Sequence, residues 1–263
     1  MINRIFVCGD IHGSAGNIRS ILAQIDNPTE EDIIIICGDA GFEYGTYIQG
    51  VAKKAAAKFP GTWIVMRGNH DNRYWEEHCE IRYDAQYEPC EWAPHQGWEF
   101  TEDGLYLYQK KYPNIKYVND TGGLYTINNY NFLFVPGAYS VDKYYRLETR
   151  RPWNPKEQLT YKEQHHLLDI TINCNENNIP IDFVVGHTFP LHRKPYYQQL
   201  FLTGLDQSSV DDNMEKFLDI LSIEFEKNPS FKQYFGGHFH GDLVMGNKYT
   251  MLYRLVENIE DYI

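Results

Sequence analysis

Six short apolar runs divide the chain, and each run stops just before a glycine. They read RIFVC, IIIIC, WIVMR, NFLFVP, DFVV and QYF, and the glycines that follow them are Gly9, Gly38, Gly68, Gly137, Gly186 and Gly236. Short, continuous runs rich in β-branched residues are typical of strands that are buried on both faces. The pattern therefore predicts six buried strands.

Segments with helical periodicity lie between the apolar runs, at residues 14–25, 47–59, 159–177 and 208–228. In the third segment, Thr160 and Glu163 have the spacing of a capping box. In the fourth, an apolar face is formed at helical spacing by Val210, Met214, Phe217, Leu221 and Phe225. Residues 241–257 read as a hairpin that turns at Gly246 and Asn247. Alternating strands and helices predict an α/β layered fold.

Residues 72–120 differ from the rest of the chain, because they are dense in aromatic and acidic residues and only weakly periodic. Long irregular segments often carry function, so this segment is either an insertion that lies over the site or a peripheral subdomain. With this segment included, we expect residues 1–263 to form a single domain.

Composition and charge narrow the class of protein. A hydrophobic fraction of 43% is ample for a core, and a net charge of -12 argues against binding to extended nucleic acid or to an anionic membrane. A small anionic substrate stays open, since a bound metal can reverse the local field. No apolar run is long enough to span a membrane, and no signal peptide is evident. The five cysteines form no CxxC pair, so we expect a cytoplasmic protein.

Metal-binding residue types follow five of the six predicted strands. They are Asp10, His12, Asp39, Asn69, His70, His187, His238 and His240. Any one of these motifs alone is more often a polar turn. However, five of the ten histidines fall in such motifs, and sites in α/β sheets form beyond the carboxyl ends of the strands. The pattern therefore predicts that these side chains converge on metal.

The motifs GDIHG, GDAG, GNHD, GHT and GGHFHG, in that order, resemble the calcineurin-like metallophosphoesterase superfamily, and they run from residue 9 to 241. The resemblance implies a four-layer α/β/β/α sandwich of two mixed sheets and a pair of divalent metal ions. It assigns Asp10, His12 and His240 to one metal. It assigns Asn69, His187 and His238 to the other metal, with Asp39 as the bridge. His70 would stay off the metals and face the substrate.

The expected donor set has consequences for the chemistry. Imidazole and oxygen donors together suit Mn, Fe, Zn, Co or Ni, and we expect Mn first. Two divalent ions, two carboxylates and one hydroxide leave a charge of about +1, which is electrophilic towards phosphate. We expect a metal-bound hydroxide to attack phosphorus in line while His70 acts as general acid. A purely structural role for His70 is the alternative.

Several further residues are weaker candidates. Arg67 could contact phosphate, or form a salt bridge at the strand edge. Tyr139, Ser140 and Lys143 could reach the substrate, or lie in an ordinary solvated loop. Asp71 could orient His70 or cap the next helix. We expect His192 and Arg193 to be exposed and to take no part in the site.

The substrate is only partly defined by the motifs. Protein serine/threonine phosphatases of the superfamily carry an aspartate three residues after the bridging ligand, and Phe42 occupies that position here. The chain more closely resembles bacterial and phage-type members, which act on nucleotides, cyclic nucleotides and other small phosphoesters. We therefore expect a mono- or diesterase acting on a small molecule or nucleotide. A protein serine/threonine phosphatase and an inactive metal-binding scaffold are the alternatives, and the sequence does not predict the oligomeric state.

Overall fold

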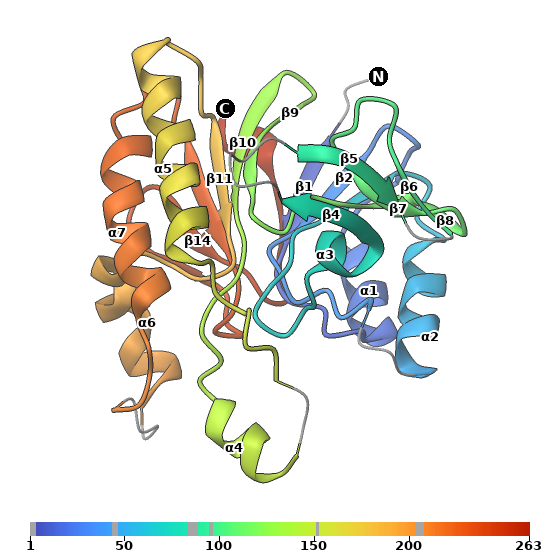
Figure 1. Ribbon diagram of the computed structural model, residues 1–263, viewed down its shortest axis with the longest axis horizontal. Helices are drawn as coiled ribbons and strands as arrows, with labels where there is room; N and C mark the ends of the chain where they lie inside the picture. The colour runs from blue at the N-terminus through green and yellow to red at the C-terminus, as the bar shows by residue number, and fades with distance from the viewer. Residues whose placement is uncertain (1–3, 44–46, 84–88, 95–96, 151–152, 204–207) are drawn as a thin grey trace.

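The structure is a computed structural model that describes residues 4–43, 47–83, 89–94, 97–150, 153–203 and 208–263. Two mixed sheets dominate it (Figure 1). Among the described residues, the first sheet has seven strands in the order β15, β1, β2, β3, β8, β7, β6, spanning Val256–Asn258, Ile5–Cys8, Ile33–Ile36, Thr62–Val65, Tyr112–Tyr117, Leu107–Gln109 and Trp98–Phe100.

The second sheet has six strands within the described residues, in the order β13, β14, β12, β11, β10, β9. They span Leu243–Val244, Tyr249–Met251, Gln233–Gly236, Phe183–Gly186, Tyr130–Val135 and Gly123–Ile127. A separate ribbon pairs β4 (Cys79–Tyr83) with β5 (Pro89–Pro94). All six predicted strands are present, as β1, β2, β3, β10, β11 and β12. The predicted hairpin is also confirmed, since β13 and β14 run antiparallel.

The helices are α1 (Ala15–Leu22), α2 (Tyr47–Ala56), α3 (Tyr74–His78), α4 (Lys143–Glu148), α5 (Tyr161–Glu176), α6 (Lys194–Phe201) and α7 (Asn213–Phe225), with 3₁₀ turns at Leu191–Arg193 and Ile259–Tyr262. The predicted capping box of Thr160 and Glu163 is formed at the start of α5. On α7 the predicted apolar positions Met214, Phe217, Leu221 and Phe225 are buried, whereas Val210 precedes the helix. None of the described helices is long and apolar enough to cross a membrane.

Three apolar clusters show how the layers stack. Alternate residues of β1 point to opposite sides: Phe6 and Cys8 pack in a cluster with α1 and α2, while Ile5 and Val7 pack with phenylalanines of the second sheet. The other face of the second sheet packs against α5 and α7. Figure 1 shows α1 and α2 on one outer side and α5, α6 and α7 on the other. The expected α/β/β/α sandwich is therefore confirmed.

Residues 98–117 differ from the first alternative, an insertion that lies over the site. They form β6, β7 and β8, which extend the first sheet beyond β3, and Trp98, Leu107 and Tyr117 pack in its core cluster. These strands are short and irregular at β7 and β8, so their periodicity is weak. Residues 84–88 and 95–96 of the same segment lie outside the described residues.

Candidate metal centre

The parallel strands bring the candidate ligands to one edge of the two sheets. β1, β2 and β3 run parallel, as do β10, β11 and β12, so the loops that follow them meet. The first two loops are joined directly, because the amides of His12 and Gly13 donate to the carbonyl groups of Asp39 and Ala40. In the second sheet, the amide of Gly237 donates to the carbonyl of His187.

Four of the candidate ligands have left-handed backbone conformations. The φ angles of His12, Asp39, His238 and His240 are 51°, 50°, 71° and 51°. The other non-glycine residues with positive φ in the described part of the chain are four asparagines and one arginine, and asparagine adopts this region most readily. Such strain clusters at functional sites. The local backbone is therefore shaped to aim these side chains.

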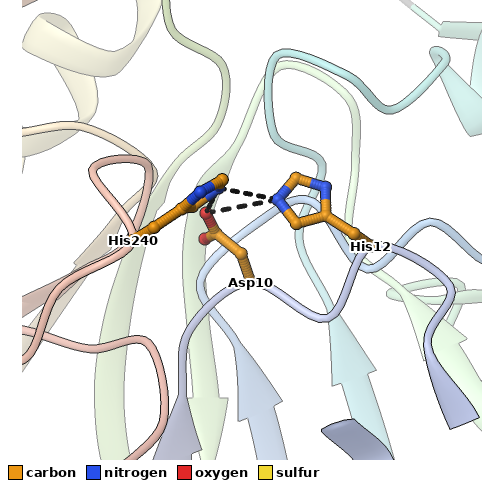
Figure 2. Close-up of side chains that lie close together, drawn as sticks. All are labelled: Asp10, His12 and His240. Carbon is orange, nitrogen blue, oxygen red and sulfur yellow. Dashed lines mark hydrogen bonds and ion pairs between the residues drawn. The ribbon is translucent and has the colours of Figure 1, made fainter. Parts of the chain in front are cut away.

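Asp10, His12 and His240 form the first group of donors (Figure 2). The Nε2 atoms of His12 and His240 lie 2.8 Å apart, and Asp10 Oδ2 lies 3.1 Å from His240 Nε2 and 3.8 Å from His12 Nε2. The backbone amide of His238 donates to the buried Asp10 carboxylate, which holds it in place. Two imidazole nitrogens and a carboxylate oxygen around one point fit a divalent transition metal.

Asn69, His187 and His238 form a second group next to the first. Asn69 Oδ1 lies 2.8 Å from His187 Nε2 and 3.1 Å from His238 Nδ1. The Nδ1 atom of His187 is 2.7 Å from the carbonyl oxygen of Cys37, to which it can only donate, so the Nε2 lone pair faces the group. The two groups adjoin, since His187 Nδ1 is 4.0 Å from Asp10 Oδ1.

The orientation of Asn69 is set by a buried chain of hydrogen bonds. Its Nδ2 donates to Ser140 Oγ at 2.8 Å, and Ser140 Oγ donates to Glu157 Oε2 at 2.5 Å. The Asn69 amide therefore presents its oxygen to His187 and His238. Ser140, a candidate substrate contact from the sequence, is buried and positions Asn69.

Asp39 belongs with the second group and is coupled to it electrostatically. Its Oδ2 lies 3.5 Å from His187 Nε2. Burial alone would raise the pKa of Asp39, but the His187 imidazole holds this pKa well below its usual range. The same pair raises the pKa of His187 to about 9, against the opposing effect of burial. A proton and a divalent cation compete for the Nε2 lone pair, so the Asp39 carboxylate that favours the proton would also favour a cation at this position.

Two glycines are required because carboxylates press against the backbone. A Cβ atom on Gly68 would lie 2.1 Å from Asp39 Oδ1, and one on Gly237 would lie 2.2 Å from Asp10 Oδ1. Both separations are far below van der Waals contact. The glycines of the motifs therefore admit the two carboxylates to the centre.

His70 lies beside the donor groups without joining either. Its backbone amide donates to Asp39 Oδ1 at 2.9 Å, and its ring centroid is 5.7 Å from that of His12. Burial lowers the pKa of His70; the Asp39 carboxylate opposes this shift and the Arg146 guanidinium adds to it. The imidazole therefore lies beside the two donor groups and is not a member of either.

Arg146 lies beside His70, and the sequence analysis did not single it out. It lies on α4, its Nη2 is 3.3 Å from His70 Nε2, and its Nε donates to Asp142 Oδ2 at 2.7 Å. Figure 1 shows α4 projecting beyond the layers of the sandwich. The i,i+4 spacing of Asp142 and Arg146 just after a strand was the available signal.

The weaker candidates take other positions. Arg67 is 1% exposed and donates to the carbonyl groups of Asp120 and Glu157, so it links interior loops instead of facing a phosphate. Tyr139 is 4% exposed and donates to the carbonyl of Ser209. The Lys143 ammonium lies 4.4 Å from the ring centroid of Trp153.

Within the described contacts, Asp71 neither orients His70 nor caps the helix that follows. Its buried carboxylate accepts from the amides of Ala40, Gly41 and Gly68, while Asp120 accepts from the first amides of α3. Asp71 thus ties the Asp39 loop to the Asn69 loop. His192 is exposed and pairs with Asp219, and Arg193 stacks on Tyr249.

Comparison with known proteins agrees with this geometry. A search of curated proteins found no match. The family model for calcineurin-like phosphoesterases matches residues 3–242, which include the strands from β1 to β12 and every candidate ligand. Members of this family hydrolyse phosphoesters with the help of metal ions. The chain therefore belongs to the calcineurin-like phosphoesterase family.

Proposed function

We propose that the protein is a dinuclear phosphoesterase that hydrolyses a mono- or diester of a small molecule or nucleotide. Asp10, His12 and His240 would hold one divalent cation. Asn69, His187 and His238 would hold the other, and Asp39 would bridge the two. The observation that supports this best is the convergence of two adjoining donor groups from five loops.

The donor set also favours particular metals and a particular charge. It combines imidazole nitrogens with carboxylate and amide oxygens, which suits Mn first, with Fe, Zn, Co or Ni as alternatives. When bound, a pair of such cations supplies Lewis acidity towards phosphate oxygens and lowers the pKa of water. Only Asp10 and Asp39 bring negative charge to the donor groups, so the centre keeps a net attraction for phosphate.

His70 and Arg146 would act directly on the substrate. As an imidazolium, His70 would hand a proton to the leaving alkoxide, which is the role of a general acid; the negative charge of a bound phosphate would favour this form against the lowering of the His70 pKa by burial and Arg146. Arg146 is a fixed donor beside His70, and a guanidinium binds phosphate oxygens well. It would orient the ester so that its leaving oxygen faces the imidazole.

The alternatives gain less support. The protein serine/threonine phosphatases carry a supporting aspartate at the position of Phe42. Phe42 is 1% exposed and packs in the core of the first sheet, so it does not take the place of that aspartate. An inactive scaffold would be expected to lose ligands or the acid, yet all seven ligand positions and His70 carry suitable side chains. The net charge of -12 disfavours extended nucleic acid.

The proposal is tested with nitrophenyl phosphate and bis-nitrophenyl phosphate as monoester and diester substrates. We expect a chelator to abolish turnover and Mn²⁺ to restore it. His70→Ala should cripple turnover while the metal content stays near that of the wild type. Full activity in metal-free protein would refute the proposal, and loss of metal from His70→Ala would make His70 a ligand or a structural residue.

A further inference from the structure

A cavity of about 270 Å³ opens beside His70 and Asn69. Its described lining is Asn69, His70, Asn72, Glu77, Trp153, Asn154 and Pro155. Asn69 and His70 form its inner end. The remaining residues come from the loop and helix that follow β3 and from the loop before α5. The cavity therefore adjoins the centre, but most of its wall is unrelated to the candidate metal ligands.

The wall has a distinctive chemistry. Trp153 supplies an indole ring, and Asn72 and Asn154 supply neutral amides that can both donate and accept hydrogen bonds. Glu77 adds a carboxylate, and no lysine or arginine is among the described residues that line the cavity, although the Lys143 ammonium lies 4.4 Å from the ring centroid of Trp153. The wall itself therefore offers mainly aromatic and neutral polar groups. An uncharged planar group with polar edges would find an aromatic surface and amide partners.

The indole of Trp153 is fixed in position relative to the donor groups. Trp153 Nε1 donates to Glu157 Oε2 at 2.8 Å. The same carboxylate accepts from Ser140, which accepts from Asn69. One buried carboxylate therefore fixes both the indole of the cavity and the amide of the donor group. Such preorganisation reduces the entropy lost on binding.

We propose that this cavity is the subsite for the leaving group of the substrate, and that it takes a nucleoside. The inference rests on the proposed function in one respect: His70 lines the cavity, and a general acid must lie within hydrogen-bonding reach of the leaving oxygen. The volume is just below the usual range for small-molecule sites, which suits one nucleoside.

The first test measures binding without metal or catalysis. Adenosine is titrated into chelator-treated protein, and its affinity is measured by calorimetry. The variant Trp153→Leu keeps apolar bulk but removes the aromatic ring. It should bind adenosine about tenfold more weakly than the wild type. Tyr161→Leu on α5, where the aromatic side chain is 72% exposed, is the matched control and should bind like the wild type. Equal affinity for Trp153→Leu and wild type, or no binding of adenosine, would overturn the proposal.

The second test separates the subsite from the proposed function. With Mn²⁺ present, Trp153→Leu should lower kcat/KM for adenosine monophosphate about tenfold more than kcat/KM for methyl phosphate, because loss of the hydrogen bond to Glu157 affects both substrates alike. If both substrates are hydrolysed and respond equally to the substitution, the subsite is wrong while the phosphoesterase stands. If neither is hydrolysed but adenosine binds through Trp153, the phosphoesterase is wrong while the subsite stands. Asn72→Ala, on the same cavity, repeats both measurements should Trp153→Leu fail to fold.

Discussion

Replacing Glu215 by glutamine should remove a pH-dependent loss of stability. Glu215 lies on α7 and is 7% exposed. Thr188, next to His187, donates to its Oε1 at 2.8 Å, and Oε2 has no hydrogen-bond partner within the described part of the chain. Burial raises the pKa of Glu215 to about 7; the nearby Asp212 carboxylate adds to this shift and Lys194 opposes it.

The sign and size of the effect follow from the two pKa values. Below pH 4.5 the side chain is neutral in both states. As the pH rises to about 7, the carboxyl ionises freely in the unfolded chain, with a pKa of 4.5, but not in the folded one. The free energy of unfolding therefore falls across this range, by about 3 kcal/mol in total. Glutamine keeps an acceptor for Thr188 and does not ionise.

Urea denaturation with a chelator present measures this effect without a contribution from metal binding. The unfolding free energy of Glu215→Gln should exceed that of the wild type by about 3 kcal/mol near pH 8 and by less than about 1 kcal/mol near pH 5. Asp169→Asn, which removes an exposed carboxylate from α5, controls for the lost charge. The reasoning is refuted if the difference for Glu215→Gln is the same at both pH values.

Three further changes test other parts of the structure. Asp39→Asn should cost more activity than any other single change of a ligand, because one carboxylate would serve both cations; a mild effect in parallel assays of all seven variants contradicts the bridge. Ser140→Ala should free the Asn69 amide and weaken metal binding roughly 10–100-fold, as measured by calorimetry. An unchanged metal affinity would show that Ser140 does not position Asn69. Thr160→Ala removes the cap of α5 and should lower the unfolding free energy by about 1 kcal/mol with no change in metal affinity, whereas a loss of metal would tie α5 to the centre.

The strands could be predicted because they are buried on both faces. The run Ile33–Ile36 is favourable only where protein covers both faces of the strand. It lies between β1 and β3 as a central strand. The helices α4 and α6 were not predicted. α4 has six residues and buries none of them, and α6 buries only Tyr197, so neither shows the apolar periodicity on which a sequence prediction depends.

The candidate ligands could be predicted because they follow strand ends, but the roles of their neighbours could not. Arg67 and Asp71 flank the Asn69–His70 motif, and both were considered as parts of the site. Their directions depend on partners far away in the sequence, such as Glu157 and Gly41. Arg146 was missed for the same reason, since its approach to His70 depends on where α4 lies.

The central claim is that folding gathers two cation sites into one centre. Equilibrium dialysis against Mn²⁺ followed by elemental analysis tests it most directly. The account predicts two ions per chain in the wild type and one ion per chain in each of the variants His240→Ala and His238→Ala. A wild type that retains fewer than two ions, or variants that both retain two, would contradict it.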